Sequence, residues 1–261
     1  MRLSVIIPVY NHAKELEQCI VSLLQQSILT DSPQDGASAP VSRREKSVRE
    51  DAEIVIVNDG STDDFNSRIF AIKDQISQSG IRLKYIDQEN SGAAVARNVG
   101  FDASTGEYLF FCDADIQLEP AALEKLMSAL ENEPSAAFSY SQFRFGWKTF
   151  ASSEFSLATL QQVNYIHTSA LIRRSLFLRF DEGLKKFQDW DLFLTIAERG
   201  GRGVFIPEVL FTIATGGTMS QWLPKFAYHA PFKYLPWWRR PIEKYEAAKK
   251  IIHHKHGLTR M

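Results

Sequence analysis

The chain of 261 residues has little of several features that define large classes of proteins. Its only two cysteines, Cys19 and Cys112, have neither a CxxC nor a zinc-ligand spacing, so they predict no disulfide framework and no structural zinc. Both lie in apolar runs, as buried thiols in a reducing compartment do. No apolar run approaches the roughly 20 residues that cross a bilayer. No signal peptide is evident before the apolar run at 3–7, so we expect a cytoplasmic protein.

The whole chain also lacks an excess of one charge, because its formal net charge is −1. This balance predicts no nucleic-acid partner. The charge is unevenly placed, since residues 222–261 carry nine Lys/Arg against two Glu. Three of the five tryptophans, Trp222, Trp237 and Trp238, lie in this basic tail. Such a composition suits peripheral contact with the inner face of the cell membrane, while packing onto the body and a homodimer contact are the alternatives.

Strands alternate with helices along the first half of the chain. Apolar runs and helical periodicity predict strands over 3–8, 53–57, 83–86 and 108–112, and helices over 13–26, 63–77, 92–104 and, from Pro120, 120–131. Short connections between such elements predict an α/β fold with a mostly parallel sheet and helices on both faces. The less regular second half predicts strands over 138–140 and 169–172, a helix over 188–198 and a last helix after Pro241, over 242–256.

Residues 27–52 interrupt this pattern, because they are polar and hold hardly any large apolar residue. We interpret them as a mobile surface loop inserted into a domain that spans 1–220. Residues 221–261 then form a basic and aromatic helical tail. The three histidines of 253–256 suggest a zinc cluster only superficially, and a solvated helix end is the better interpretation.

Polar residues follow three of the predicted strands: Tyr10 and Asn11, Asn58 and Asp59, and Asp113 to Asp115. In a parallel sheet, ligands bind beyond the carboxyl ends of the strands. Asp113 and Asp115 are one residue apart after a strand, so their carboxylates can converge. Convergent carboxylates need a cation, and their hard oxygens suit Mn²⁺ or Mg²⁺ that also contacts substrate phosphates. A lone Asp-x-Asp would more simply indicate an acidic turn.

Five sequence blocks occur in order, at 4–11 (SVIIPVYN), 54–63 (IVIVNDGSTD), 96–100 (ARNVG), 113–115 (DAD) and 188–191 (QDWD). Together they resemble family 2 glycosyltransferases with the GT-A fold, apart from an unusually long 27–52 loop. The resemblance implies a Rossmann-like sheet and an inverting, metal-dependent hexosyltransferase-type enzyme. Its donor is a nucleotide-diphosphate sugar, first of all a UDP-sugar, and its acceptor is a hydroxyl of a growing glycan or lipid-linked saccharide.

The resemblance also implies roles for individual residues in nucleotide-sugar binding. They are assigned to Pro8, Val9, Tyr10, Asp59, Arg97, Asp113 and Ala114. Tyr10 can stack on the base and Asp59 can accept an imide N–H, although Asp59 also suits a turn that caps the following helix. Arg97 can pair with Asp113 or reach the diphosphate, and a helix-surface ion pair is its simpler role.

The metal and the proton transfer are assigned to carboxylates. Asp115 is the direct metal ligand, and Asp113 contacts the ribose or the metal shell. Asp189 aligns with the catalytic base that removes the proton of the acceptor hydroxyl. Asp191 is its rival, but residues two apart at a helix start do not share a face, so only one can point into the cleft.

Some positions depart from the family pattern. Gln188 stands where Glu is usual, Asn58 where Asp is common, and Ala214 near a position that often holds His. A third protein ligand to the metal is therefore in doubt, although residues 216–220 could form a lid. The departures leave open a catalytically weak nucleotide-sugar-binding protein. A sugar nucleotidyltransferase would need a glycine-rich basic loop after the first strand, and an oxidoreductase a GxGxxG there, and the sequence has neither.

Overall fold

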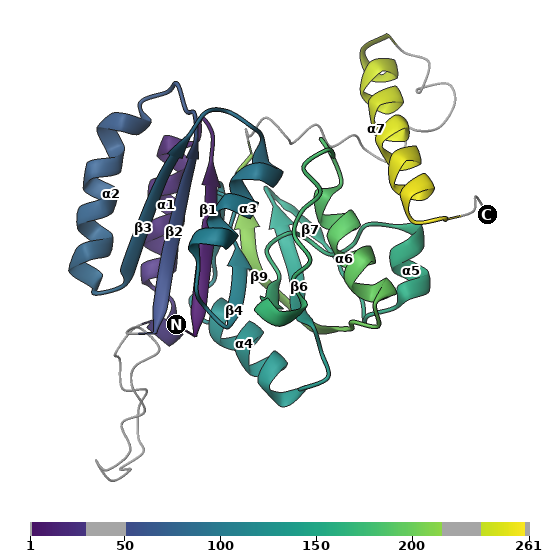
Figure 1. Ribbon diagram of the computed structural model, residues 1–261, viewed down its shortest axis with the longest axis horizontal. Coiled ribbons are helices and arrows are strands. Elements are labelled where there is room, and N and C mark those ends of the chain that lie inside the picture. Colours follow the sequence, from purple (N-terminus) through teal and green to yellow (C-terminus); the bar gives the residue numbers. More distant parts are fainter. Residues whose placement is uncertain (1, 30–50, 216–235, 259–261) are drawn as a thin grey trace.

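Helices pack on both faces of one nine-stranded sheet (Figure 1). The computed structural model describes residues 2–29, 51–215 and 236–258. The strands are β1 (Leu3–Val9), β2 (Ala52–Asp59), β3 (Arg82–Gln88), β4 (Tyr108–Phe111), β5 (Ile116–Leu118), β6 (Phe138–Phe145), β7 (Lys148–Phe150), β8 (Leu171–Arg173) and β9 (Gly203–Ile213). The helices are α1 (Ala13–Leu24), α2 (Phe65–Ser79), α3 (Ala93–Ala103), α4 (Ala122–Asn132), α5 (Leu157–Gln162), α6 (Gln188–Glu198) and α7 (Pro236–Lys255), with short 3₁₀ turns η1 (Ser27–Leu29) and η3 (Arg174–Leu176).

The strand order is β3-β2-β1-β4-β8-β6-β9-β5, with β7 paired to β6. The first four strands are parallel, and Leu3 is in register with both Ala52 and Tyr108. Beyond β4 the sheet is mixed, because β8 is antiparallel to β4 and to β6, while β9 is parallel to β6. The predicted fold class, a Rossmann-like mostly parallel sheet flanked by helices, is confirmed.

Alternate residues of β1 enter two different hydrophobic cores. Leu3, Val5 and Ile7 pack against residues of α1, α2 and α4, whereas Ile6 packs on the other face with residues of α3 and α6. A strand buried on both faces reads as a continuous apolar run, which explains the sequence of β1. Because both faces are covered, the carboxyl ends of these strands are the places where polar side chains can meet a ligand.

The structure corrects the two helix starts that we assigned to prolines. Pro120 lies in a turn, and α4 begins at Ala122, whose N–H donates to the Glu119 carbonyl at 2.9 Å. Pro241 lies inside α7, which begins at Pro236. Both predictions were wrong: Pro120 precedes the first residue of α4 by two positions, and Pro241 is the sixth residue of α7, beyond the first turn in which proline is best tolerated.

Sequence patterns missed the long strand β9. Its register with β6 passes from Ile206 directly to Val209, so the intervening Pro207 lies in a bulge. A proline in an apolar run argues against a central strand, and the bulge is what accommodates it. In the loop predicted over 27–52, residues 27–29 form η1 and Ala52 opens β2, while 30–50 lie outside the described residues. The division into 1–220 and 221–261 stays a prediction.

Within the described ranges, no helix has both the length and the apolarity that a membrane crossing requires.

Candidate active site

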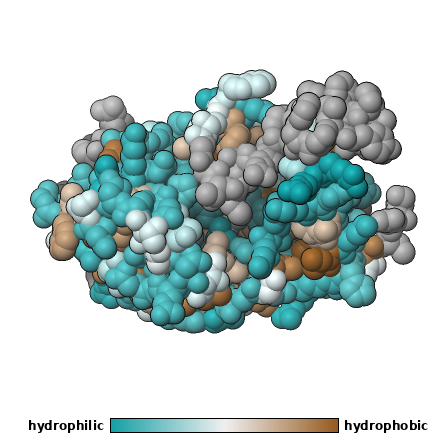
Figure 2. All heavy atoms as spheres, turned by 90° about the horizontal axis from the view of Figure 1, so that it is seen from above, coloured by the Kyte–Doolittle hydropathy of each residue, from teal (hydrophilic) through white to brown (hydrophobic). Residues whose placement is uncertain are grey.

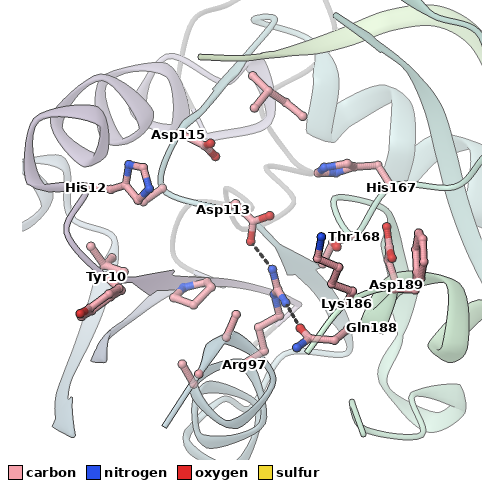
Figure 3. A pocket seen from close by; sticks show the side chains of 18 of the residues that line it. Tyr10, His12, Arg97, Asp113, Asp115, His167, Thr168, Lys186, Gln188 and Asp189 are labelled. Atoms are coloured by element: carbon pink, nitrogen blue, oxygen red, sulfur yellow. Dashed lines mark hydrogen bonds and ion pairs between the residues drawn. The ribbon is translucent and has the colours of Figure 1, made fainter. Parts of the chain in front are cut away.

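The carboxyl ends of β1, β2 and β4 open onto one cavity of about 610 Å³, to which the first turns of α3 and α6 also contribute (Figure 3). All the residues that the sequence assigned to a site line this cavity: Pro8, Val9, Tyr10, Asp59, Arg97, Asp113, Ala114, Asp115 and Asp189. Figure 2 views the molecule from this end, where the described surface is mostly hydrophilic. The fold therefore brings together side chains from five separate segments.

The turn after β1 is tied to the loop after β2. Asn11 has a left-handed backbone conformation, with φ of 56°, and its Oδ1 accepts from the backbone N–H groups of Thr62 at 2.7 Å and Asp63 at 3.3 Å. Tyr10, just before it, lines the cavity and is 42% exposed. An accessible ring on a fixed turn can stack on a flat base.

Asp59 is buried at the end of β2 and anchors the loop that leads into α3. Its carboxylate accepts from the Gln88 amide and the backbone N–H groups of Ser91 and Gly92, at 2.8 to 2.9 Å. Gly60 has φ of 73°, and a Cβ there would lie 2.8 Å from the backbone of this loop. Asp59 thus fixes the start of α3 rather than that of α2. Because a carboxylate offers about four acceptor sites, Asp59 can also accept a hydrogen bond from an N–H group of a ligand.

Arg97 joins the acidic end of β4 to the start of α6. Its Nη2 donates to Asp113 Oδ1 at 2.6 Å and its Nη1 to Gln188 Oε1 at 2.8 Å (Figure 3). The Arg97 side chain is buried, so this is no surface ion pair. Burial by itself would raise the pKa of Asp113, but Arg97 and His167 hold that pKa below its ordinary value. Asp113 is therefore an ionised carboxylate whose charge Arg97 shares.

Asp115 carries a charge that its surroundings do not balance. Burial, together with the nearby Asp113, raises the pKa of Asp115 to about 6, and His12 is the charged group among the described residues that opposes this shift. In the described part of the chain no side chain donates a hydrogen bond to the Asp115 carboxylate. A bound cation would remove this electrostatic cost, as expected for two carboxylates that share a site.

The donor set at this point fits a divalent cation. Asp113 and Asp115 offer hard oxygen atoms, which Mg²⁺ and Mn²⁺ prefer, and the cavity has room for phosphates that complete the coordination. The described residues contain no group of three or more His, Cys, Asp or Glu side chains that could hold a metal ion by themselves. The site therefore fits a cation that is shared with a phosphate ligand rather than one held by protein alone.

The two aspartates of α6 have different surroundings. Asp189 lines the cavity, and its Oδ1 accepts from the N–H of Trp190 at 2.8 Å. Asp191 is buried and faces α7, where its carboxylate pairs with Lys255 at 2.7 Å and His256 at 2.9 Å. Only Asp189 is thus placed to meet a substrate, and its role as the base stays a prediction.

Sequence reasoning missed several residues that line the cavity. These are His12, Asn90, Phe143, Phe145, Phe150, Asn164, Thr168, Lys186, Phe187 and Tyr245. His167 also lines the cavity, and its ring points into it (Figure 3). Burial lowers the pKa of His167, whose Nδ1 accepts from the Ser169 N–H at 3.1 Å. For the aromatic residues of the cavity, the sequence offered one local signal: Phe143 and Phe145 are two residues apart, so on a strand their side chains lie on the same face.

The end of α7 is solvated at His254, which is exposed, but not at His256, so our interpretation of these histidines was wrong for His256. The His256 side chain is 3% exposed, and its ring nitrogens lie 2.9 Å from Asp191 and 2.8 Å from Glu198. Lys255 pairs with the same Asp191 and with Asp181. We call these five residues the clasp. The error arose because the acidic partners lie on other elements, far from the histidines in sequence.

The clasp should weaken as pH rises. Burial alone would lower the pKa of His256, but its bonds to Asp191 and Glu198 raise that pKa above 6.5. A group with a raised pKa in the folded state stabilises that state fully below its unfolded pKa, and the contribution is lost as pH rises through the folded pKa. Lys255 keeps its charge throughout. Amide exchange over 250–257, corrected for intrinsic rates, should be slower at about pH 6 than at about pH 8, and His256→Gln should abolish the difference. Equal protection at both values in the unchanged protein would contradict this.

The strand order and the cavity at the strand ends place this protein in the class of proteins with the GT-A glycosyltransferase fold. S. aureus TarS (residues 1–349 with UDP-GlcNAc) superposes with a TM-score of 0.64 at 21% identity, over 86% of this chain and 62% of that chain. Glucosyl-3-phosphoglycerate synthase from Mycobacterium tuberculosis, with Mn²⁺, UDP and glucosyl-3-phosphoglycerate, has a TM-score of 0.56 at 16% identity, over 99% of this chain and 81% of that chain. At these identities the likeness concerns the fold.

The chain belongs to glycosyl transferase family 2, whose model matches residues 4–186. A relative from Escherichia coli strain K12, the uncharacterized glycosyltransferase YibD, is 35% identical over 137 residues, which are 52% of this chain and 33% of that protein. The chain thus spans about a third of the length of this relative. The residues that match the family model include the ends of β1, β2 and β4 but stop before Phe187, so α6 and α7 lie beyond the matched range.

Proposed function

We propose that this protein transfers a sugar from a UDP-sugar to a hydroxyl of a growing glycan or lipid-linked saccharide, with inversion and with Mn²⁺ or Mg²⁺. One observation carries the proposal: the under-compensated pair Asp113 and Asp115 shares a cavity with Asp189, which comes from a different element. A diphosphate-binding pair and a separate carboxylate are what a sugar transfer from a nucleotide needs.

The position of each residue in the cavity suggests its role in the proposed reaction. Tyr10 and Asp59 lie at the rim and at the end of β2, where they would hold the base, and Asp113 and Asp115 would hold the cation. A bound divalent cation supplies positive charge to the diphosphate as it leaves. Asp189 takes the proton of the acceptor hydroxyl while that oxygen bonds to the anomeric carbon and the bond from that carbon to UDP breaks. The products are the glycoside and UDP, and the configuration at the anomeric carbon is inverted.

Arg97 would support the site through charge. Because Gln188 is neutral, Asp113 is the carboxylate that balances Arg97 in the described part of the chain. The buried Nε of Arg97 has no hydrogen-bond partner there. A guanidinium with a donor to spare is suited to an anionic ligand or an ordered water beside it.

A thermal-stability screen of nucleotide sugars tests the proposal. A ligand at about 100 times its Kd stabilises the folded state by about 2.7 kcal/mol, which is roughly 5–10 °C in Tm for a chain of this size. We expect a UDP-sugar with Mn²⁺ to give such a shift and the same sugar with EDTA to give much less. Release of UDP from that donor then separates an enzyme from a binding protein. No shift with any nucleotide sugar would overturn the proposal, and a shift without UDP release would favour the catalytically weak binder.

Contact with the inner face of the cell membrane through 222–261, a cytoplasmic location and a homodimer stay predictions. Of this tail the described residues are 236–258, and the proposed lid at 216–220 lies outside them. Within the described part, the clasp supports the alternative that the tail packs onto the body.

A further inference from the structure

Helix α7 reaches the cavity although it lies beyond the residues that match the family. Tyr245, near the middle of α7, is one of the cavity-lining residues. Its ring packs edge-to-face on Phe187, with ring centroids 5.2 Å apart. Phe187 is followed at once by Gln188 and Asp189, so α7 contacts the turn that carries the proposed base.

Phe187 is held in an unfavourable backbone conformation. Its φ of 60° is left-handed, which for a bulky side chain costs on the order of 1–3 kcal/mol and persists only where the surroundings enforce it. Two aromatic rings contact it, because Trp190 packs on it with ring centroids 5.5 Å apart and Tyr245 with ring centroids 5.2 Å apart. Its carbonyl accepts from the Asp191 N–H at 2.9 Å, which is the first hydrogen bond of α6. The direction in which Asp189 points therefore depends on the conformation of Phe187.

The clasp fixes α7 against the same helix. Asp191, 3% exposed, pairs with Lys255 and His256, while the ring of His253 packs on Trp190 at 5.7 Å. A buried carboxylate with two cationic partners specifies one geometry, since losing a partner leaves an uncompensated charge. Helix α7 is thus held at its end by ion pairs that include Asp191 and at its middle by ring packing on Phe187, the residue before α6.

We propose that α7 is part of the transfer site and that Tyr245 is a positioning residue, which acts through Phe187 on Asp189. The inference rests on the proposed function and deepens it. A general base must lie within hydrogen-bond reach of the acceptor hydroxyl, and a displacement of about 1 Å can cost about 100-fold in rate. Tyr245 contributes by keeping the strained turn in the conformation that directs Asp189 into the cavity.

Kinetics of Tyr245→Ala and Tyr245→Phe test the role of the ring. With UDP-GlcNAc and Mn²⁺ as the probe, we expect Tyr245→Ala to lower kcat for UDP release at least about ten-fold with the donor KM unchanged. Tyr245→Phe keeps the ring and should stay within about two-fold of the unchanged protein. Lys250→Ala, an exposed change on the same helix outside the clasp, is the matched control. A donor KM that rises as kcat falls would overturn the proposal.

Hydrogen exchange distinguishes this proposal from the proposed function, because it needs no donor. In Tyr245→Ala the amides of 188–191 should exchange at least about five-fold faster, with those of β1 unchanged, whereas Tyr245→Phe and Lys250→Ala should leave both regions unchanged. Unchanged exchange over 188–191 would overturn the proposal. If the unchanged protein released no UDP from any nucleotide sugar, only the proposed function would fail, and the exchange result would still decide whether Tyr245 holds this turn.

Discussion

Asp189→Asn will lower the turnover of sugar transfer about 1,000-fold and leave the affinity for UDP and Mn²⁺ within about two-fold of the unchanged protein. Asparagine has the shape of aspartate, and its amide oxygen can still accept from the Trp190 N–H, as Asp189 does at 2.8 Å. It cannot take up a proton. The change therefore removes general-base catalysis, which is worth about 100- to 10,000-fold, and keeps the fold and the donor site.

The measurement is kcat at saturating donor, with the Kd of UDP and Mn²⁺ determined by calorimetry. Asp102→Asn is the matched control, because Asp102 is an exposed aspartate that pairs with Arg179 away from the cavity. Near-normal turnover in Asp189→Asn would show that Asp189 is not the catalytic base. Asp191→Asn is a less direct comparison, since it breaks the clasp and so also acts through stability.

Asp115→Asn will make the metal-free protein more stable and abolish its stabilisation by Mn²⁺ with UDP. A pKa of about 6 means that at neutral pH Asp115 is ionised in the folded state, and that this charge lowers the stability of the folded state. Removing this partly buried charge should stabilise the metal-free protein on the order of 1 kcal/mol, or roughly 2–4 °C in Tm. A carboxylate that binds a cation lowers the stability of the metal-free protein, so its replacement by a neutral side chain should raise that stability.

The matched comparison is Asp113→Asn, the other carboxylate of the pair. Asp113 balances the buried Arg97, so its loss leaves a guanidinium uncompensated and should lower stability by about 2–3 kcal/mol. Both variants should lose the thermal shift with UDP and Mn²⁺, and their metal-free Tm values should move in opposite directions. A fall in Tm for metal-free Asp115→Asn, or an unchanged Mn²⁺ effect, would contradict the assignment of the cation site.

The first half of the fold could be predicted because its signals are local. The apolar runs of β1, β2 and β4 reflect burial on both faces, and each ends in the polar residues that face the cavity. In a parallel sheet such ends must meet at one edge, so Tyr10, Asp59 and Asp113 could be assigned to one place without coordinates. Boundaries differed by one or two residues in most of these elements, and the two proline-based helix starts were wrong.

The second half offered weaker local signals. The bulge at Pro207 concealed β9, and the short strand β7 has only three residues, too few for a periodicity. The aromatic side of the cavity was missed for the same reason. Phe143 and Phe150 stack at 4.9 Å because β6 and β7 form a hairpin, and neither residue by itself indicates a site.

By itself the sequence determined the mostly parallel class of the sheet, the strand ends that meet at the cavity and the pair of aspartates proposed to bind a cation. These follow from alternation and chain order, which act over a few residues. Tertiary structure alone decided which aspartate of α6 lines the cavity. Asp189 faces the cavity because Asp191 is taken by Lys255 and His256, more than sixty residues away in the chain. Such a pairing depends on where α7 docks, and charge complementarity between distant segments leaves no periodic trace in a sequence.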